Sequence, residues 1–214
     1  MTRRTINGLY AITPDSSDID DLLQRVEACL AGGAGVLQYR NKHVAAPHLA
    51  MAGVLAARCR AYKVPFIVND DIELTLAVGA DGVHLGREDG DCLAARARLG
   101  PDRIIGISCY DSLQRALTAQ QGGADYVAFG SVFPSLTKPH APHVPLSLLA
   151  EARRRLQTPI VAIGGISLHN AAQVIQAGAD AVAVISAVFD APDVGLAAQE
   201  FSNLFKQGTT ESSS

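Results

Sequence analysis

The sequence predicts an α/β protein with one domain and, within that class, a closed TIM (β/α)8 barrel. Short apolar runs, typical of buried parallel strands, alternate with longer amphipathic segments that are typical of helices. The alternation yields eight strand–helix units, the number that closes such a barrel. The length of 214 residues suits one barrel, and no shift in composition marks a second domain.

The expected strands are short apolar runs bounded by glycine, proline or charged residues. They span residues 8–12, 35–39, 65–68, 82–85, 103–107, 126–129, 159–163 and 181–185. Each is followed by a segment with apolar residues at helical spacing, and the first of these has cap candidates between Asp15 and Asp21. The expected helices span 19–31, 47–63, 72–78, 92–99, 113–121, 146–156, 168–177 and 194–205. We therefore expect the barrel domain to occupy residues 1–207, followed by a disordered tail at 208–214 that lacks apolar residues.

A repeat marks the turns that lead from a helix into a strand. Gly-Ala begins at Gly33, Gly79, Gly123 and Gly178, about two strand–helix units apart. Glycine can take the left-handed conformation that ends a helix, and alanine allows close packing. The alternative is that Gly-Ala is simply a common helix–strand turn, which favours an α/β fold equally.

Composition limits the partners and the compartment. The net charge of −3 and the pI of about 6.0 give no reason to expect a nucleic-acid partner. The four cysteines stand singly, without C-x-x-C, which favours reduced thiols and a cytoplasmic protein. No apolar stretch is long enough for a membrane span, and no long apolar segment follows the N-terminus. Whether the chain forms a homo-oligomer stays open.

Polar residues follow the second predicted strand directly. In a barrel of this kind, the active site is built from the loops that follow the strands. Alternation along the strand would point Gln38, Arg40 and Lys42 the same way, and two cations with an amide suit an anionic ligand. The alternative is a solvated strand end, in which two neighbouring cations repel unless something negative lies between them.

Carboxylates follow the third and fourth predicted strands. Asp70 and Asp89 would suit Mg²⁺, which is usually held by one or two carboxylates, waters and substrate phosphates. Helix capping is the alternative, with Asp71 and Asp89 as the caps. Capping needs one Asp for each helix, and acids are here in excess.

Hydroxyl and ammonium groups follow the sixth strand. Ser131, Ser135, Thr137 and Lys138 have the chemistry to bind a phosphate or a pyrophosphate, although an ordinary surface turn has the same composition. Ser108, at the end of the fifth strand, is either functional or the N-cap of the next helix.

Backbone amides follow the last two strands. Gly164 and Gly165 come after the seventh strand and Ser186 after the eighth, where barrels commonly bind phosphate at the N-terminus of an extra helix. His140 and His143 show no metal-binding spacing, and no serine or cysteine nucleophile motif occurs. Hydrolysis through a covalent intermediate is therefore not expected.

Five motifs occur in order along the chain: Q-Y-R-N-K at 38–42, V-N-D-D at 68–71, G-A-D-G-V-H-L-G-R-E-D at 79–89, F-G-S-V-F-P-S-L-T-K at 129–138 and A-I-G-G-I at 162–166. Together they resemble the thiamine phosphate synthase family, from Leu9 to about Phe189. The resemblance implies a transferase of thiamine biosynthesis with a TIM barrel fold. Such an enzyme joins hydroxymethylpyrimidine pyrophosphate to thiazole phosphate, or to its carboxylated form, with Mg²⁺, and releases pyrophosphate. Because the aminopyrimidine is electron-rich, we expect pyrophosphate to leave first, so that the thiazole nitrogen captures a carbocation.

The resemblance also implies three groups of site residues. The pyrimidine pyrophosphate would contact Gln38, Tyr39, Arg40, Asn41, Lys42, Asn69, Ser108 and Lys138. The thiazole phosphate would contact Ser135, Leu136, Thr137, Gly165, Ile185 and Ser186, while Asp70 and Asp89 would hold Mg²⁺. The expected catalytic residues are Lys138, Arg40 and Ser108, which would stabilise charge on the leaving pyrophosphate. Ser135 stands where the family usually has threonine, and residues 139–141 replace a commonly acidic or lysine-containing stretch.

Three other functions stay open at this point. A thiazole tautomerase of the same superfamily would have a histidine where this chain has Tyr110. A phosphosugar isomerase would need a general base, for which His84 is the candidate at a strand end. A regulatory or binding barrel would need no paired carboxylates.

Overall fold

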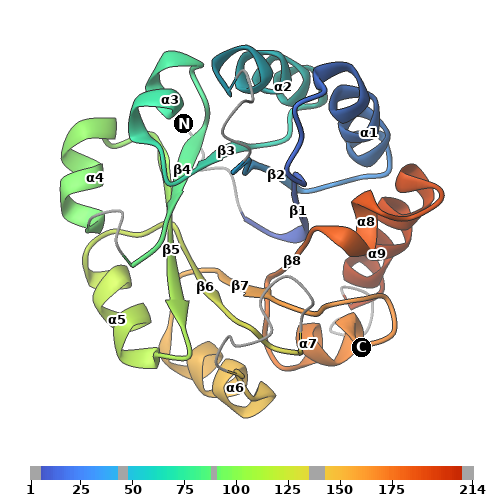
Figure 1. Ribbon diagram of the computed structural model, residues 1–214. Coiled ribbons are helices and arrows are strands. Elements are labelled where there is room, and N and C mark those ends of the chain that lie inside the picture. Colours follow the sequence, from blue (N-terminus) through green and yellow to red (C-terminus); the bar gives the residue numbers. More distant parts are fainter. Residues whose placement is uncertain (1–5, 43–47, 88–90, 135–142, 209–214) are drawn as a thin grey trace.

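Eight parallel strands form a closed barrel, in which each strand pairs with its neighbours in chain order and β1 pairs with β8. The computed structural model describes residues 6–42, 48–87, 91–134 and 143–208. Figure 1 looks down the barrel and shows the helices as a ring around it. This architecture confirms the predicted TIM barrel and its single domain.

The strands are β1 (Gly8–Ile12), β2 (Val36–Tyr39), β3 (Phe66–Asn69), β4 (Gly82–Leu85), β5 (Ile104–Tyr110), β6 (Tyr126–Phe129), β7 (Ile160–Ile163) and β8 (Ala181–Val184). All eight agree with the expected strands to within three residues at either end. The largest difference is in β5, which continues to Tyr110 because a register shift between Ser108 and Tyr110 lets it keep pairing with β6.

The helices are α1 (Ile19–Ala31), α2 (His48–Tyr62), α3 (Ile72–Ala77), α4 (Cys92–Leu99), α5 (Leu113–Gln121), α6 (Leu146–Arg155), α7 (Ala171–Gln176), α8 (Ser186–Phe189) and α9 (Val194–Gly208). Helix α7 begins later than predicted because Asn170 turns back on the chain, where its Oδ1 accepts a hydrogen bond from the Ser167 backbone. Helix α9 continues through Gly208, one residue into the expected tail, and residues 209–214 lie outside the described ranges. None of the helices in the described ranges combines the length and hydropathy that crossing a membrane requires.

Two apolar clusters stabilise the barrel, one on each side of the sheet. The interior cluster includes Tyr10, Ile67 and Tyr126, all almost completely buried. The larger cluster lies between the outer side of the sheet and the helices, and includes Leu9 and Val127. Successive residues of a strand point to opposite sides of the sheet, so continuous apolar runs are what such strands require.

The Gly-Ala repeat closes the amino-terminal end of the barrel. In three copies the next residue is an aspartate whose carboxylate accepts a backbone N–H near the start of the preceding strand; the pairs are Asp81 with Phe66, Asp125 with Ile105 and Asp180 with Ile160. Arginines from neighbouring helices pair with two of these carboxylates, at 2.6 Å for Arg96 with Asp125 and 2.9 Å for Arg153 with Asp180. The repeat therefore joins neighbouring strands and anchors α4 and α6 to them.

Candidate active site

The expected site residues come from the carboxyl ends of different strands, and these ends share one face of the parallel barrel. The described members are Gln38, Tyr39, Arg40, Asn41 and Lys42 at the end of β2, Asn69 and Asp70 at the end of β3, Ser108 in β5, Gly165 after β7, and Ile185 and Ser186 after β8. Asp89, Ser135, Leu136, Thr137 and Lys138 lie outside the described residues, as does His140.

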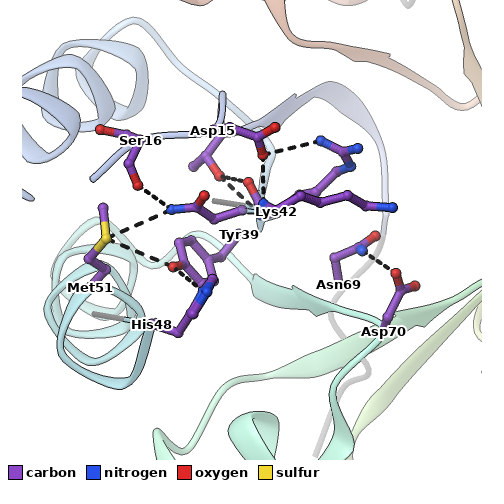
Figure 2. Close-up of polar contacts among 11 residues, drawn as sticks. Asp15, Ser16, Tyr39, Lys42, His48, Met51, Asn69 and Asp70 are labelled. Atoms are coloured by element: carbon purple, nitrogen blue, oxygen red, sulfur yellow. Dashed lines mark hydrogen bonds and ion pairs between the residues drawn. The ribbon is translucent and has the colours of Figure 1, made fainter. Parts of the chain in front are cut away.

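A carboxylate stands between the two cations that follow β2. Arg40 Nη1 lies 3.4 Å from Asp15 Oδ1, and the same oxygen accepts a hydrogen bond of 2.7 Å from the backbone N–H of Lys42. Figure 2 shows Asp15 at the base of Lys42, whose side chain extends towards Asn69 and Asp70. Asp15 thus places a negative charge beside the Arg40 guanidinium and fixes the backbone of Lys42.

Residues at the end of β1 hold the end of β2 in place. The hydroxyl of Thr13, a fully buried residue, donates to the carbonyl oxygen of Arg40 at 2.9 Å and accepts from its N–H at 3.0 Å. No local pattern in the sequence marks Thr13, and Asp15 was expected only as a cap candidate of α1. The N-cap is Asp18, which accepts hydrogen bonds from the backbone N–H groups of Asp20 and Asp21.

Two members of the 38–42 stretch turn away from the barrel. The hydroxyl of Tyr39 lies 3.1 Å from His48 Nδ1 on α2 (Figure 2). Asn41 Nδ2 donates to the carbonyl oxygen of Ser16. The Tyr39 ring is almost completely buried beside α2, and the residue also lines the cavity at the ends of β2 and β3, so its contact with the pyrimidine pyrophosphate stays a prediction. Its backbone atoms stay available at the strand end.

Asp70 is the surplus carboxylate that the sequence indicated. Asp71 caps α3 by accepting from the Leu74 N–H, and Asp91 caps α4 by accepting from the Ala94 N–H, so capping requires neither Asp70 nor Asp89. Asp70 is exposed and has a φ of 63°, a left-handed conformation that costs free energy for any residue except glycine. Strain of this kind is concentrated at functional sites.

Asp70 also lines a cavity. The cavity has a volume of about 520 Å³ and lies beside the ends of β2 and β3, where α2 and α3 also line it; Lys42, Asn69 and Asp70 are among its lining residues, together with His48 of α2 and Leu74 of α3. Within the described ranges, no cluster of three His, Cys, Asp or Glu side chains could hold a metal ion. A carboxylate beside a cationic strand end fits a hard divalent ion that completes its coordination with water and phosphate oxygens.

Ser108 binds a histidine instead of capping a helix. Its Oγ lies 2.9 Å from His84 Nε2, while the N-cap of α5 is Ser112. A serine and a histidine are therefore in contact here. No local motif indicated this pair, because 24 residues separate the two in the sequence. The group at the other ring nitrogen is the Tyr126 hydroxyl, 2.9 Å from Nδ1, and burial raises the pKa of this phenol so that it stays neutral. The group at Nδ1 is thus a phenol, where serine hydrolases place the carboxylate that stabilises an imidazolium.

Helix α5 supports Ser108 from below. Arg115 Nε donates to the carbonyl oxygen of Ser108 at 2.7 Å, and its Nη2 donates to that of Gly86 at 3.1 Å. The guanidinium therefore joins the carboxyl ends of β4 and β5. Nothing in the local sequence singled out Arg115, which looked like an ordinary charged residue of an exposed helix face.

The expected phosphate end has the predicted extra helix. α8 begins directly after β8 at Ser186, which is exposed, and the first N–H groups of any helix have no intrahelical acceptor. Gly165 is also exposed, with a φ of 61°, and a β-carbon at this position would lie 2.4 Å from the carbonyl oxygen of Pro134. The close approach of the loop after β6 explains the glycine as well as a phosphate would, so glycine here has a structural reason of its own.

Comparison with known proteins identifies the family. The family model described as thiamine monophosphate synthase matches residues 9–188. The chain belongs to this family. Among curated relatives, the thiamine-phosphate synthase of Methylobacillus flagellatus is 56% identical over 209 residues, covering 96% of this chain and 100% of the relative. That of Aromatoleum aromaticum is 57% identical over 206 residues, covering 96% and 99%.

A solved structure agrees in both fold and sequence. The thiamine phosphate pyrophosphorylase from Pyrococcus furiosus superposes with a TM-score of 0.84 at 38% identity, covering 95% of this chain and 98% of that one. Thiamine phosphate synthesis by a transferase, as the motifs predicted, is thereby confirmed. The tautomerase is not favoured, and the residue at its histidine position, Tyr110, lies instead beneath the guanidinium of Arg87, 4.8 Å from the ring centre.

Proposed function

We propose that this thiamine monophosphate synthase family member binds hydroxymethylpyrimidine pyrophosphate over the ends of β2, β3 and β5. The observation that carries the proposal is the surplus carboxylate of Asp70 in one cavity with Lys42, next to the Arg40 strand end. Cations suit pyrophosphate oxygens, and a carboxylate that no helix cap requires suits the divalent ion that accompanies them. Gln38 and Ser108 would contact the pyrimidine pyrophosphate from inside the barrel, and Lys138 would contact it from the loop after β6.

The metal in this proposal is Mg²⁺, held by Asp70 and Asp89. When bound, it would neutralise negative charge on the pyrophosphate oxygens. Asp71 is not a ligand, because its carboxylate is engaged as the cap of α3. The Asn69 amide donates to Asp70, which orients the carboxylate.

Thiazole phosphate would bind at the opposite side of the barrel mouth, at the ends of β6, β7 and β8. Its phosphate would contact residues 135–137 together with Gly165, Ile185 and the start of α8 at Ser186. Backbone N–H groups at a helix start suit an anion. The thiazole nitrogen would then face the pyrimidine methylene across the barrel mouth.

The reaction would begin with cleavage of the bond between the pyrimidine methylene and the pyrophosphate oxygen. The bond's electron pair stays on pyrophosphate, and the electron-rich aminopyrimidine stabilises the cation that the thiazole nitrogen captures. No protein nucleophile takes part. The task of Arg40, Lys138 and Ser108 is to stabilise charge on the leaving pyrophosphate, and preorganised electrostatics usually make the largest contribution to the catalysis of such a step.

Pyrophosphate release with both substrates and Mg²⁺ tests the assignment directly. Release should require all three components, and release that continues without thiazole phosphate at the same rate would contradict it. Lys138→Ala should slow the chemical step by roughly 10²–10³ in single turnovers. Arg154→Ala removes an exposed cation on α6, far from the barrel mouth, and should leave the rate unchanged. An electron-withdrawing substituent on the pyrimidine should slow the reaction severely; an unchanged single-turnover rate would favour associative displacement.

A further inference from the structure

A line of hydrogen bonds crosses the barrel interior from Gln38 to Ser108. Gln38 Nε2 donates to Tyr10 Oη at 2.8 Å, and Tyr10 Oη lies 2.6 Å from Tyr126 Oη. Tyr126 Oη lies 2.9 Å from His84 Nδ1, and His84 Nε2 lies 2.9 Å from Ser108 Oγ. This interior chain joins five strands and ends at two residues of the proposed pyrimidine pyrophosphate site.

The barrel is shaped to admit this chain. A β-carbon on Gly106 would lie 1.9 Å from Cζ of Tyr126, so the phenol occupies the space that a side chain on β5 would fill. Glycine inside a strand weakens the strand, and it commonly marks a position where another group approaches closely. The Tyr126 ring also stacks on His84, with ring centres 5.5 Å apart.

The amide of Gln38 gives the chain a direction. The Gln38 nitrogen can only donate, so the Tyr10 oxygen accepts from it and the Tyr10 proton goes to Tyr126. Tyr126 then donates to His84 Nδ1, and a neutral imidazole in this arrangement carries its proton on Nε2, directed at Ser108. If instead Tyr126 donated to Tyr10, the proton of the buried Tyr10 hydroxyl would point at the Gln38 amide nitrogen, which cannot accept it. Burial raises the pKa of both phenols, so each keeps the one proton that this order requires.

We propose that Tyr10, Tyr126 and His84 are positioning residues that make Ser108 a hydrogen-bond donor to the pyrophosphate. The Ser108 oxygen accepts from His84, and its own proton is directed at the anion. Ser108 is then not a nucleophile, because His84 holds its proton towards the serine and cannot act as the base. This inference rests on the proposed function for the identity of the anion, and its geometry stands independently.

The direction of the chain can be measured without substrate. In the full-length protein labelled with ¹⁵N-histidine, His84 should carry its proton on Nε2, with Nδ1 unprotonated and hydrogen-bonded; His84→Gln identifies the signal. Tyr126→Phe keeps the ring that fills the space beside Gly106 and removes the hydroxyl. The ¹⁵N chemical shift of His84 Nδ1 should therefore move towards that of an imidazole nitrogen that accepts no hydrogen bond. A proton on Nδ1 in the wild type, or an Nδ1 signal that Tyr126→Phe leaves unmoved, would overturn the proposal.

Binding of inorganic pyrophosphate with Mg²⁺, measured by calorimetry, tests whether Tyr126 acts through Ser108. Ser108→Ala should weaken binding by about tenfold or more, as expected for a hydrogen bond to a charged group, and Tyr126→Phe by about threefold to tenfold. The double variant should bind no more weakly than Ser108→Ala alone, since the two residues form one unit. The coupling between Tyr126 and Ser108 would be refuted if the two single-variant losses of affinity multiplied in the double variant. It would also be refuted if Tyr126→Phe bound pyrophosphate as tightly as the wild type.

Two controls separate positioning from folding and from the proposed function. Tyr62→Phe removes an exposed phenol hydroxyl at the end of α2 and should change neither measurement. If Tyr126→Phe fails to fold in urea titrations, Tyr10→Phe takes its place, because it removes the residue that transmits the direction from Gln38. A wild type that binds pyrophosphate but makes no thiamine phosphate refutes the proposed function alone. If the protein makes thiamine phosphate but the double variant loses as much pyrophosphate affinity as the two single variants multiplied together, only the positioning role is refuted.

Discussion

Replacing Gly106 by alanine should destabilise the protein by about 2–6 kcal/mol. The new β-carbon would lie 1.9 Å from Cζ and 2.3 Å from Oη of Tyr126, whereas carbon atoms in contact prefer about 3.5–4.0 Å. The ring must therefore move by about 1.5 Å or more, and overpacking of this kind costs about 1–3 kcal/mol. The movement also disrupts the hydrogen bonds of Tyr126 to Tyr10 and His84, each of which contributes about 0.5–1.5 kcal/mol.

A second glycine provides a matched control for this substitution. Gly53 lies within α2, and a β-carbon there would meet no atom within 4 Å. Gly53→Ala adds the same methyl group, yet it should stabilise the protein by about 0.5–1 kcal/mol because alanine favours the helix. Urea unfolding followed by circular dichroism measures both variants. If Gly106→Ala unfolds at the wild-type urea concentration, Tyr126 does not occupy the space beside Gly106 and the interior chain is wrong.

Three further changes separate binding from stability. Asp70→Asn should abolish most activity at limiting Mg²⁺ with little change in stability, while Asp71→Ala should lose about 1 kcal/mol of stability with its helix cap; equal turnover at limiting Mg²⁺ would exclude Asp70 as a ligand. Ser186→Ala should raise the KM for thiazole phosphate and leave pyrophosphate binding unchanged, and the reverse pattern in titrations would place the phosphate elsewhere. Gly165→Val would not test the phosphate site as well as Ser186→Ala does, because the valine side chain would collide with Pro134 whether or not phosphate binds there. Burial raises the pKa of Cys109 from 9.0 to about 12, so its contribution to stability is complete below about pH 9 and is lost as the pH rises towards 12. The urea midpoint should fall over that range by more in the wild type than in Cys109→Ala, and parallel curves would contradict this.

Local signals account for the parts of the fold that could be predicted. A strand such as β4 is bounded by a Gly-Ala-Asp turn on one side and polar residues on the other, and both signals lie within a few residues of it. Helix ends were less certain because several caps compete near them, as Asp15 and Asp18 did at α1. Asp18 is the cap because its carboxylate reaches the N–H groups of the first turn, whereas the carboxylate of Asp15 accepts from the backbone N–H of Lys42 beyond the neighbouring strand β2.

The order of strands and helices, the barrel and the face that carries the site follow from the sequence alone, because they depend on periodicity and on residues that directly follow each strand. The five motifs, taken in order along the chain, also indicate the family without any structure. Which side chains meet was decided only by the tertiary structure. Tyr10 and Tyr126 are 116 residues apart, and His84 and Ser108 are 24 apart, yet they form one line of hydrogen bonds. Their contact depends on strand register and on the space left by Gly106, and no local pattern encodes either of these.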